Sequence, residues 1–323
     1  MSNLMTIAKL SPGNGIPLTI ECDQKITVEQ LIRDHKSEID LKLREHGAIY
    51  FKGFGIDAIS QFENVSELFC ENLYTKYGDL PSIAESKKVY GATPYPPDKT
   101  IYFHNEASHT PTFPSKQLFL CIKAAPEGGG LSIVDGRNVL RNLPPELVEE
   151  FAAKKLMYCR NFIPYVDVKW QDFFKTTCKI ELEAACHDDG LEFEWKKGDI
   201  FSTRRVAPAI ITHPITKELT WFNQIQLHHP GMMEEKIYKV FRKSYEEFDF
   251  PRYVCFGDGT PIPQETLSLI SQVLQEQSET IYAKEGDIIY VDNLLVAHCR
   301  LPYKGERQVR VALGDPMVES DLR

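Results

Sequence analysis

Helical and extended patterns of apolar positions both occur along the chain. Thr27-Val28-Glu29-Gln30 has the form of a capping box, which predicts a helix that runs to about Glu45 and ends at Gly47. The continuous apolar run at 48–51 predicts a buried strand. Further helices are expected over residues 59–73, 144–154, parts of 170–185, 234–248 and 263–276.

Short apolar segments between turn residues predict strands over 101–104, 117–123, 209–212, 219–222, 287–291 and 308–313. Many short strands, with helices gathered in the first half and the middle, indicate a mainly β (α+β) fold, an antiparallel barrel or jelly roll with added helices. No internal repeat or long linker interrupts the pattern, so we expect one domain over residues 1–323 with helical insertions. Gly128-Gly129-Gly130 does not lie between a strand and a helix, which disfavours a nucleotide-binding fold.

Composition narrows the location and the partners. The 323 residues are 42% apolar and carry a formal charge of -9, which disfavours a duplex nucleic-acid partner. No apolar run reaches the ~20 residues of a membrane helix. The N-terminus lacks the apolar stretch of a secretory signal, so a cytoplasmic protein without membrane contact is expected. The eight cysteines are scattered without a CxxC pair, which predicts free thiols rather than a zinc finger.

Two His-x-acid pairs are candidate metal ligands. Residues two apart on a strand point the same way, about 7 Å apart at Cα, so an imidazole and a carboxylate can meet at one ion. Composition predicts about one such pair by chance, and the chain has two, His104-Asn105-Glu106 and His187-Asp188-Asp189. His187 follows a helical stretch and precedes Gly190, which is typical of a solvated helix end. His104 ends a predicted strand, and we therefore prefer His104 and Glu106.

A third ligand must come from elsewhere in the chain. His298 follows a predicted strand and the turn at Asp292-Asn293. Its competitors are His213, His228 and His229. If His228 and His229 lie on a strand, they face opposite ways and cannot both bind one ion. The residues that follow His298 favour it as the distal ligand.

The segment Cys299-Arg300-Leu301-Pro302-Tyr303-Lys304-Gly305-Glu306-Arg307-Gln308-Val309-Arg310 resembles the closing segment of the taurine dioxygenase family. The likeness is closer to the syringomycin-type hydroxylases of peptide-antibiotic pathways. From Ala48 onward, further segments of this chain resemble motifs of those hydroxylases and follow one another in the same order. They are Phe103-His104-Asn105-Glu106, Pro126 to Gly130, Asp135-Gly136-Arg137, Tyr158 to Phe162, Trp170 to Thr176, Thr203-Arg204, His213-Pro214, Trp221 to Gln224 and Asp292-Asn293.

The resemblance implies a double-stranded β-helix that binds Fe(II) through His104, Glu106 and His298, with 2-oxoglutarate and O2 as co-substrates. An arginine clamps the far carboxylate of 2-oxoglutarate, since a guanidinium can bind it through two parallel hydrogen bonds. Arg310 is preferred for this role because it opens a strand, and Arg307 is then expected to bind the substrate or solvent. Leu131 stands where the family often has a threonine that helps to bind 2-oxoglutarate. Either this contact is missing here, or Ser132 beside it replaces the threonine.

The activity implied is hydroxylation of an unactivated carbon of an amino acid, free or presented on a peptidyl carrier protein, in specialised-metabolite biosynthesis. Halogenating relatives replace the carboxylate ligand by Gly or Ala, so Glu106 favours hydroxylation or, as an alternative, desaturation by the same iron chemistry. Arg204, Asn223 and Gln224 are candidate pocket walls. Two other classes stay open: a zinc hydrolase with the same three ligands, and a non-catalytic jelly-roll binding module.

Overall fold

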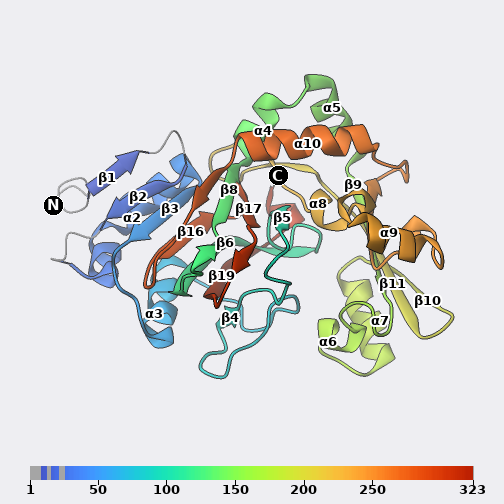
Figure 1. Ribbon diagram of the computed structural model, residues 1–323, viewed down its shortest axis with the longest axis horizontal. Coiled ribbons are helices and arrows are strands. Elements are labelled where there is room, and N and C mark those ends of the chain that lie inside the picture. Colours follow the sequence, from blue (N-terminus) through green and yellow to red (C-terminus); the bar gives the residue numbers. More distant parts are fainter. Residues whose placement is uncertain (1–8, 13–15, 22–25, 323) are drawn as a thin grey trace.

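Two β-sheets face each other at the centre of the molecule (Figure 1). The computed structural model describes residues 9–12, 16–21 and 26–322. The larger sheet has seven strands, in the order β1 (Lys9–Pro12), β2 (Leu18–Glu21), β3 (Ala48–Lys52), β16 (Ile288–Asp292), β6 (Thr112–Lys123), β19 (Gln308–Val318) and β4 (Val89–Gly91). All neighbouring strands are antiparallel except β2 and β3.

The smaller sheet has four antiparallel strands, in the order β15 (Glu279–Ile281), β8 (Leu131–Asp135), β17 (Val296–Arg300) and β5 (Ile101–His104). Apolar side chains from both sheets pack in one cluster between them, which includes Phe119, Ile133, Ile289 and Val311. Burial of this apolar area holds the sheets face to face.

Helices cover the outer faces of both sheets. Helices α2 (Val28–His46) and α3 (Ile59–Phe69) pack on the seven-stranded sheet, because their apolar side chains share a cluster with Leu118, Leu120 and Ile288. Helices α4 (Gly136–Asn142), α5 (Pro145–Lys154) and α10 (Gln264–Glu276) pack on the smaller sheet, in a cluster with Val134 and Ala297. The order is therefore helix, sheet, sheet, helix.

A third sheet lies to one side of this core (Figure 1). Its order is β10 (Glu192–Lys196), β11 (Ile200–Ala207), β9 (Leu156–Phe162) and β14 (Arg252–Phe256). Helices α6 (Trp170–Phe174) and α7 (Lys179–Asp188) pack against it. The remaining elements are the hairpin β12 (Ile210–Thr212) and β13 (Leu219–Trp221), the ribbon β7 (Glu127–Gly128) and β18 (Tyr303–Lys304), helices α8 (Ile225–His228) and α9 (Glu235–Arg242), and the 3-10 turns η1 (Pro230–Met232), η2 (Glu247–Asp249) and η3 (Glu319–Leu322).

The signals at the ends of α2 act as predicted. The Thr27 hydroxyl accepts a hydrogen bond from the Gln30 amide at 3.2 Å. Gly47 ends the helix with φ at 71°, a conformation that costs glycine little. The predicted strand at 48–51 is confirmed as β3. Mixed α and β structure with mostly short strands is likewise confirmed.

Two predicted helices are shorter than expected. Helix α3 ends at Phe69 rather than near residue 73, because the Asp315 carboxylate accepts hydrogen bonds from the amides of Glu71 and Asn72. Helix α9 ends at Arg242 rather than at 248, and the Arg242 guanidinium donates to the Tyr245 carbonyl. In both places a side chain satisfies backbone groups that would otherwise continue the helix.

His228 is the last residue of the short helix α8. The assumption that His228 and His229 lie on a strand and therefore face opposite ways was wrong. The described part of the chain contains no helix that is long and apolar enough to cross a membrane. The cysteines placed by the structure are free thiols, as predicted. Residues 1–8, in which no secretory signal is expected, lie outside the described residues.

Candidate metal centre

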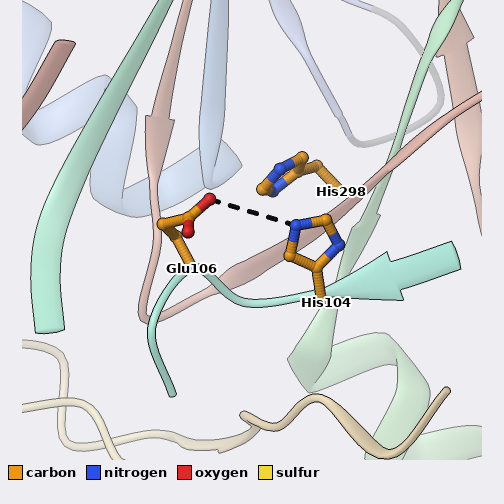
Figure 2. A group of neighbouring side chains, drawn as sticks. All are labelled: His104, Glu106 and His298. Atoms are coloured by element: carbon orange, nitrogen blue, oxygen red, sulfur yellow. Dashed lines mark ion pairs between the residues drawn. The ribbon is translucent and has the colours of Figure 1, made fainter. Parts of the chain in front are cut away.

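Two adjacent strands and the loop after one of them bring His104, Glu106 and His298 together (Figure 2). His298 on β17 lies directly opposite His104 on β5 in the antiparallel ladder, and Glu106 follows β5. The two imidazole ring centres are 4.2 Å apart. One ligand atom from each of the three side chains lies within 4.8 Å of the others, and all three residues are buried. Cross-strand pairing explains how residues 194 positions apart share one site.

Both imidazoles are arranged so that they can act as metal ligands. His104 Nδ1 is 2.8 Å from the Tyr102 carbonyl, which fixes the proton on Nδ1 and leaves Nε2 free for a metal. Burial, with the nearby His104, holds the pKa of His298 well below its ordinary value. His298 is therefore neutral at pH 7, the form that binds metals. Its ring stands edge-on to Phe119, with centres 5.1 Å apart.

The backbone at Glu106 is held from the turn that precedes β17. Asn293 accepts a hydrogen bond from the Glu106 amide at 2.7 Å and donates to the Glu106 carbonyl at 3.0 Å. Asn105 donates to the Asn293 carbonyl at 2.8 Å. The next residue, Ala107, has φ at 55°, which is uncommon for a residue with a side chain and redirects the chain after Glu106. The sequence motifs included Asn293, but its role was not predicted.

The Glu106 carboxylate has two further partners that the sequence did not indicate. The Tyr77 hydroxyl donates to Oε1 at 2.5 Å, and Gln117 Nε2 donates to Oε2 at 3.3 Å. Oε2 is the oxygen that lies 4.0 Å from His104 Nε2. Tyr77 is in an irregular loop and Gln117 is on β6, so no spacing rule relates either of them to Glu106. Their side chains reach the site only because the two sheets face each other.

A cavity of about 290 Å³ opens above the three residues. Its walls include the Pro-rich loop that follows β4, of which Ala92, Thr93, Pro94 and Tyr95 border the space. Arg300, two positions after His298, holds this loop: it donates to the carbonyls of Tyr95 at 3.2 Å, Pro96 at 2.7 Å and Lys99. A segment close to the metal ligands is thus fixed by the same strand that carries His298.

Arg307 and Arg310 both border this cavity, but their side chains leave the backbone in different directions. Arg310 pairs with Leu120 on β6, and Leu120 packs with helices α2 and α3. Val309 and Val311 belong to the cluster between the sheets. Since successive side chains on a strand point to opposite faces, Arg310 leaves β19 on the helix-covered face. Its Nε finds no hydrogen-bond partner among the described residues.

Arg307 lies between this cavity and a second one of about 260 Å³. Its Nε donates to the Gly129 carbonyl at 3.0 Å, and its guanidinium lies 5.6 Å from the centre of the Tyr303 ring. Burial and the neighbouring Arg300 hold the pKa of Arg307 below its ordinary value. Within the described chain its terminal nitrogens meet no acidic side chain, so this cation can receive a carboxylate.

Leu131 borders both cavities, at the position where the family often has threonine. Ser132 does not border the metal cavity. Its hydroxyl lies 2.7 Å from the Thr280 hydroxyl on the neighbouring strand β15. Adjacent residues of β8 point to opposite faces, so the expected replacement of threonine by Ser132 is corrected: Ser132 joins two strands of the smaller sheet.

The three expected pocket residues also lie outside the walls of the metal cavity. Arg204 on β11 of the third sheet pairs with Glu194 at 3.5 Å and lies over the ring of Phe248 in η2. Asn223 donates to the Ala209 carbonyl at 3.1 Å, and Gln224 donates to the Asn105 carbonyl at 3.0 Å. The Asn223 backbone amide also donates to the Asn105 side-chain oxygen at 3.1 Å, so Asn223 and Gln224 both support the loop that carries Glu106, and their effect on the site is indirect.

The remaining candidate histidines have structural partners. His213 Nε2 lies 3.2 Å from the Asp292 carboxylate, and its Nδ1 accepts the Thr216 amide at 3.0 Å. His229 Nε2 lies 3.0 Å from the Ile262 carbonyl. His187 is exposed at the end of α7, as predicted. Among the described residues, the only group of three or more His, Cys, Asp and Glu side chains close enough to hold a metal is His104, Glu106 and His298.

The donor set fits iron(II). Two neutral imidazoles and one carboxylate on one side of an ion leave positions for a chelating co-substrate and for O2. The Nδ1 atom of His298 is buried and finds no hydrogen-bond partner within the part of the chain that the structure describes. The cavity above the ligands and the carboxylate-free guanidinium of Arg307 accommodate a small dicarboxylate.

Comparison with known proteins agrees with this chemistry. Residues 9–313 match the taurine catabolism dioxygenase TauD, TfdA family. The chain is 35% identical over 322 residues to the dapdiamide synthesis protein DdaC of Enterobacter agglomerans, which covers 99% of this chain and 97% of that protein. It is 28% identical over 295 residues to a clavaminate synthase-like protein of Arabidopsis thaliana, covering 88% and 86% of the two chains.

Solved structures show the same fold at low sequence identity. A taurine dioxygenase from Burkholderia xenovorans superposes with a TM-score of 0.58 at 14% identity, covering 98% of this chain and 93% of that one. AAD-2 in complex with Mn(II) and N-oxalylglycine superposes with a TM-score of 0.56 at 11% identity, covering 95% and 96%. The chain belongs to the TauD, TfdA family and is an iron(II)- and 2-oxoglutarate-dependent dioxygenase, which uses O2 as its oxidant.

Proposed function

We propose that this dioxygenase hydroxylates an unactivated carbon of an amino-acid-type small molecule in specialised-metabolite biosynthesis. The observation that carries the proposal is the intact set of His104, Glu106 and His298 at the base of the cavity. Iron(II) with 2-oxoglutarate and O2 supplies an oxidant for C–H bonds, while 2-oxoglutarate becomes succinate and CO2. The carboxylate of Glu106 occupies the place that halogenating relatives leave open, which supports hydroxylation.

In this proposal Arg307, rather than Arg310, binds the far carboxylate of 2-oxoglutarate. Arg307 borders the cavity beside Leu131 and has unpaired terminal nitrogens among the described residues. Arg310 also borders the cavity, but its position in the alternation along β19 favours the helix-covered face for its side chain. This proposal exchanges the roles that the sequence predicted for the two arginines.

The substrate class rests on the relatives. The name of the DdaC relative places that protein in dapdiamide synthesis, and the sequence motifs resemble the syringomycin-type hydroxylases. We therefore propose an amino-acid-derived substrate, either free or bound to a peptidyl carrier protein, in a peptide-antibiotic type of pathway. We also propose that residues 1–323 make one cytoplasmic domain, and that its two central sheets correspond to a double-stranded β-helix.

The test supplies the protein with iron(II), 2-oxoglutarate, isotopically heavy O2 and amino acids, both free and carrier-bound. We expect succinate that depends on iron and O2, and a product that gains one oxygen atom, because one atom of O2 enters succinate and the other enters the product. A product that instead loses two hydrogens would establish desaturation.

Two outcomes would overturn the proposal. Zinc-dependent hydrolysis without consumption of 2-oxoglutarate would establish a hydrolase. Failure to bind iron(II) and 2-oxoglutarate in an anaerobic titration would establish a non-catalytic module. If the triad is the active site, the His298→Ala variant should form no succinate, while its far-ultraviolet circular dichroism stays unchanged.

A further inference from the structure

Tyr77 contacts the metal-binding carboxylate although it lies outside every motif in the sequence. Its hydroxyl is 2.5 Å from Glu106 Oε1, a length typical of a charge-assisted O–H to carboxylate hydrogen bond. An ionised carboxylate can only accept a hydrogen bond, so the Tyr77 hydroxyl is the donor to this oxygen.

The two oxygens of Glu106 are in different surroundings. Oε1 accepts the Tyr77 hydroxyl, whereas Oε2 lies 4.0 Å from His104 Nε2 and faces the ligand group (Figure 2). The contact of Gln117 Nε2 with Oε2 is longer, at 3.3 Å. The stronger hydrogen bond is thus on the oxygen that points away from the imidazoles.

The Tyr77 ring is itself fixed by aromatic neighbours. It meets Tyr74 edge-on, with ring centres 6.0 Å apart, and Tyr90 edge-on at 6.4 Å. The hydroxyls of Tyr74 and Tyr90 are buried and find no hydrogen-bond partner among the described residues. Of these three tyrosines, Tyr77 is the one whose hydroxyl is committed to the site.

We propose that Tyr77 is a positioning residue that keeps Glu106 bound to the metal through Oε2 alone. A carboxylate that binds through both oxygens takes one more coordination position. The site needs two positions for 2-oxoglutarate and one for O2, so a two-oxygen carboxylate would compete with them. By occupying Oε1, the Tyr77 hydroxyl keeps that position open. This inference rests on the proposed iron and 2-oxoglutarate site.

The test compares Tyr77→Phe with Tyr74→Phe, its matched control. Each variant loses one buried hydroxyl from the same aromatic group, but only Tyr77→Phe loses a hydrogen bond to Glu106. Iron(II) is titrated anaerobically into each protein with 2-oxoglutarate present, and the visible absorption of the iron–2-oxo acid chelate is followed. We expect Tyr77→Phe to weaken chelate formation by about 10- to 100-fold and to shift the absorption maximum. Tyr74→Phe should stay within about twofold of the parent.

The outcomes separate the inference from the proposed function. If the parent protein forms no chelate, the iron and 2-oxoglutarate site itself fails, and this inference fails with it. If the parent forms the chelate and both variants match it in affinity and absorption maximum, only the role of Tyr77 is overturned. Thermal unfolding of the metal-free variants shows whether a loss of affinity comes from misfolding, and equal unfolding temperatures for the two variants support the positioning role.

Discussion

Arg307 and Arg310 lie three positions apart on one segment, yet they differ in surroundings. Arg307 borders both cavities and bonds to Gly129, while Arg310 shares its strand phase with Ala312, which packs among the helices. The irregular pairing between Gln308 and Val309 separates the two positions and breaks the simple alternation along β19. The direction of each side chain therefore depends on this bulge.

Arg307→Lys should raise the dissociation constant for 2-oxoglutarate by about 10- to 100-fold, because lysine keeps the charge but cannot form two parallel hydrogen bonds to a carboxylate. Arg310→Lys should change it by less than about threefold. Anaerobic titration of the iron-loaded protein measures both constants. A larger effect at Arg310 than at Arg307 would restore the assignment first made from the sequence.

Stability at the residue scale also depends on buried histidines. Burial lowers the pKa of His228 well below its ordinary value, and the adjacent His109, with ring centres 5.0 Å apart, adds to this effect. Burial likewise lowers the pKa of His109. An unfolded histidine has a pKa of about 6.5, so below that pH the unfolded chain binds protons that the folded protein does not. The contribution of these two neutral histidines to the free energy of unfolding is therefore present above pH 6.5 and is lost as the pH falls below it.

His228→Gln should therefore make the free energy of unfolding less dependent on pH. Between pH 7 and pH 5 the free energy of unfolding of the metal-free parent should fall more steeply than that of the variant. The difference in slope is at most about 1.4 kcal/mol per pH unit, the limit for one titrating group. Urea denaturation at several pH values measures this. The exposed His187→Gln is the control, and a variant whose slope equals that of the parent would show that His228 does not contribute.

At the element scale, the turn between β16 and β17 organises the ligands. Asn293 in this turn is fully buried and bonds to both backbone groups of Glu106 and to the Pro114 carbonyl at 2.7 Å. It thereby joins the strand that carries His298 to the loop that carries Glu106. The ligand geometry is thus set by backbone contacts between elements as well as by the ligands themselves.

Asn293→Ala should lower the free energy of unfolding by about 3 kcal/mol, because it leaves several buried backbone groups without partners. Asn142→Ala removes an exposed amide that donates to the Asn138 carbonyl and should cost less than about 1 kcal/mol. Urea denaturation of the metal-free proteins provides the comparison. Equal losses in the two variants would contradict the structural role of Asn293.

The loop at 92–99 is the second element that depends on a strand of the site. Arg300 donates to three of its carbonyls, and the Tyr303 amide donates to the Pro97 carbonyl at 2.8 Å. Since this loop borders the cavity, its position determines the shape of the entrance. Arg300 is the natural point at which to test its anchoring.

Arg300→Lys should speed amide hydrogen exchange in residues 92–99 by at least about tenfold, because one ammonium cannot bond to three separated carbonyls. Exchange in β6 should stay unchanged and serves as the internal reference. Mass spectrometry of peptides from both segments reads out the effect. Unchanged exchange in the loop would show that other contacts hold it.

At the scale of the whole molecule, the four layers place the site between two sheets and seal its outer faces with helices. His104 and His298 lie on the smaller central sheet, which contains β5 and β17. The supporting side chains of Gln117 and Phe119 come from the seven-stranded sheet. A site built from both sheets is rigid only when both are packed. The fold therefore positions the iron ligands, and the family likeness extends over almost the whole chain.

The sequence by itself determined the local elements and the residue types of the site. Capping signals defined α2, apolar runs defined β3 and β5, and the motif order identified His104, Glu106 and His298 as ligands to test. These features depend on neighbours within a few positions, which a sequence displays directly. Leu131 at the expected threonine position was also visible, and it does border the cavity.

Only the tertiary structure decided which other side chains reach the site. Tyr77, Gln117 and Asn293 meet Glu106 across turns and between sheets, and no periodicity in the sequence relates them to it. Ser132 and Arg204 point elsewhere, because strand phase and the placement of the third sheet set their directions. A one-residue change of phase reverses a side chain, and that phase is fixed by pairing between distant strands.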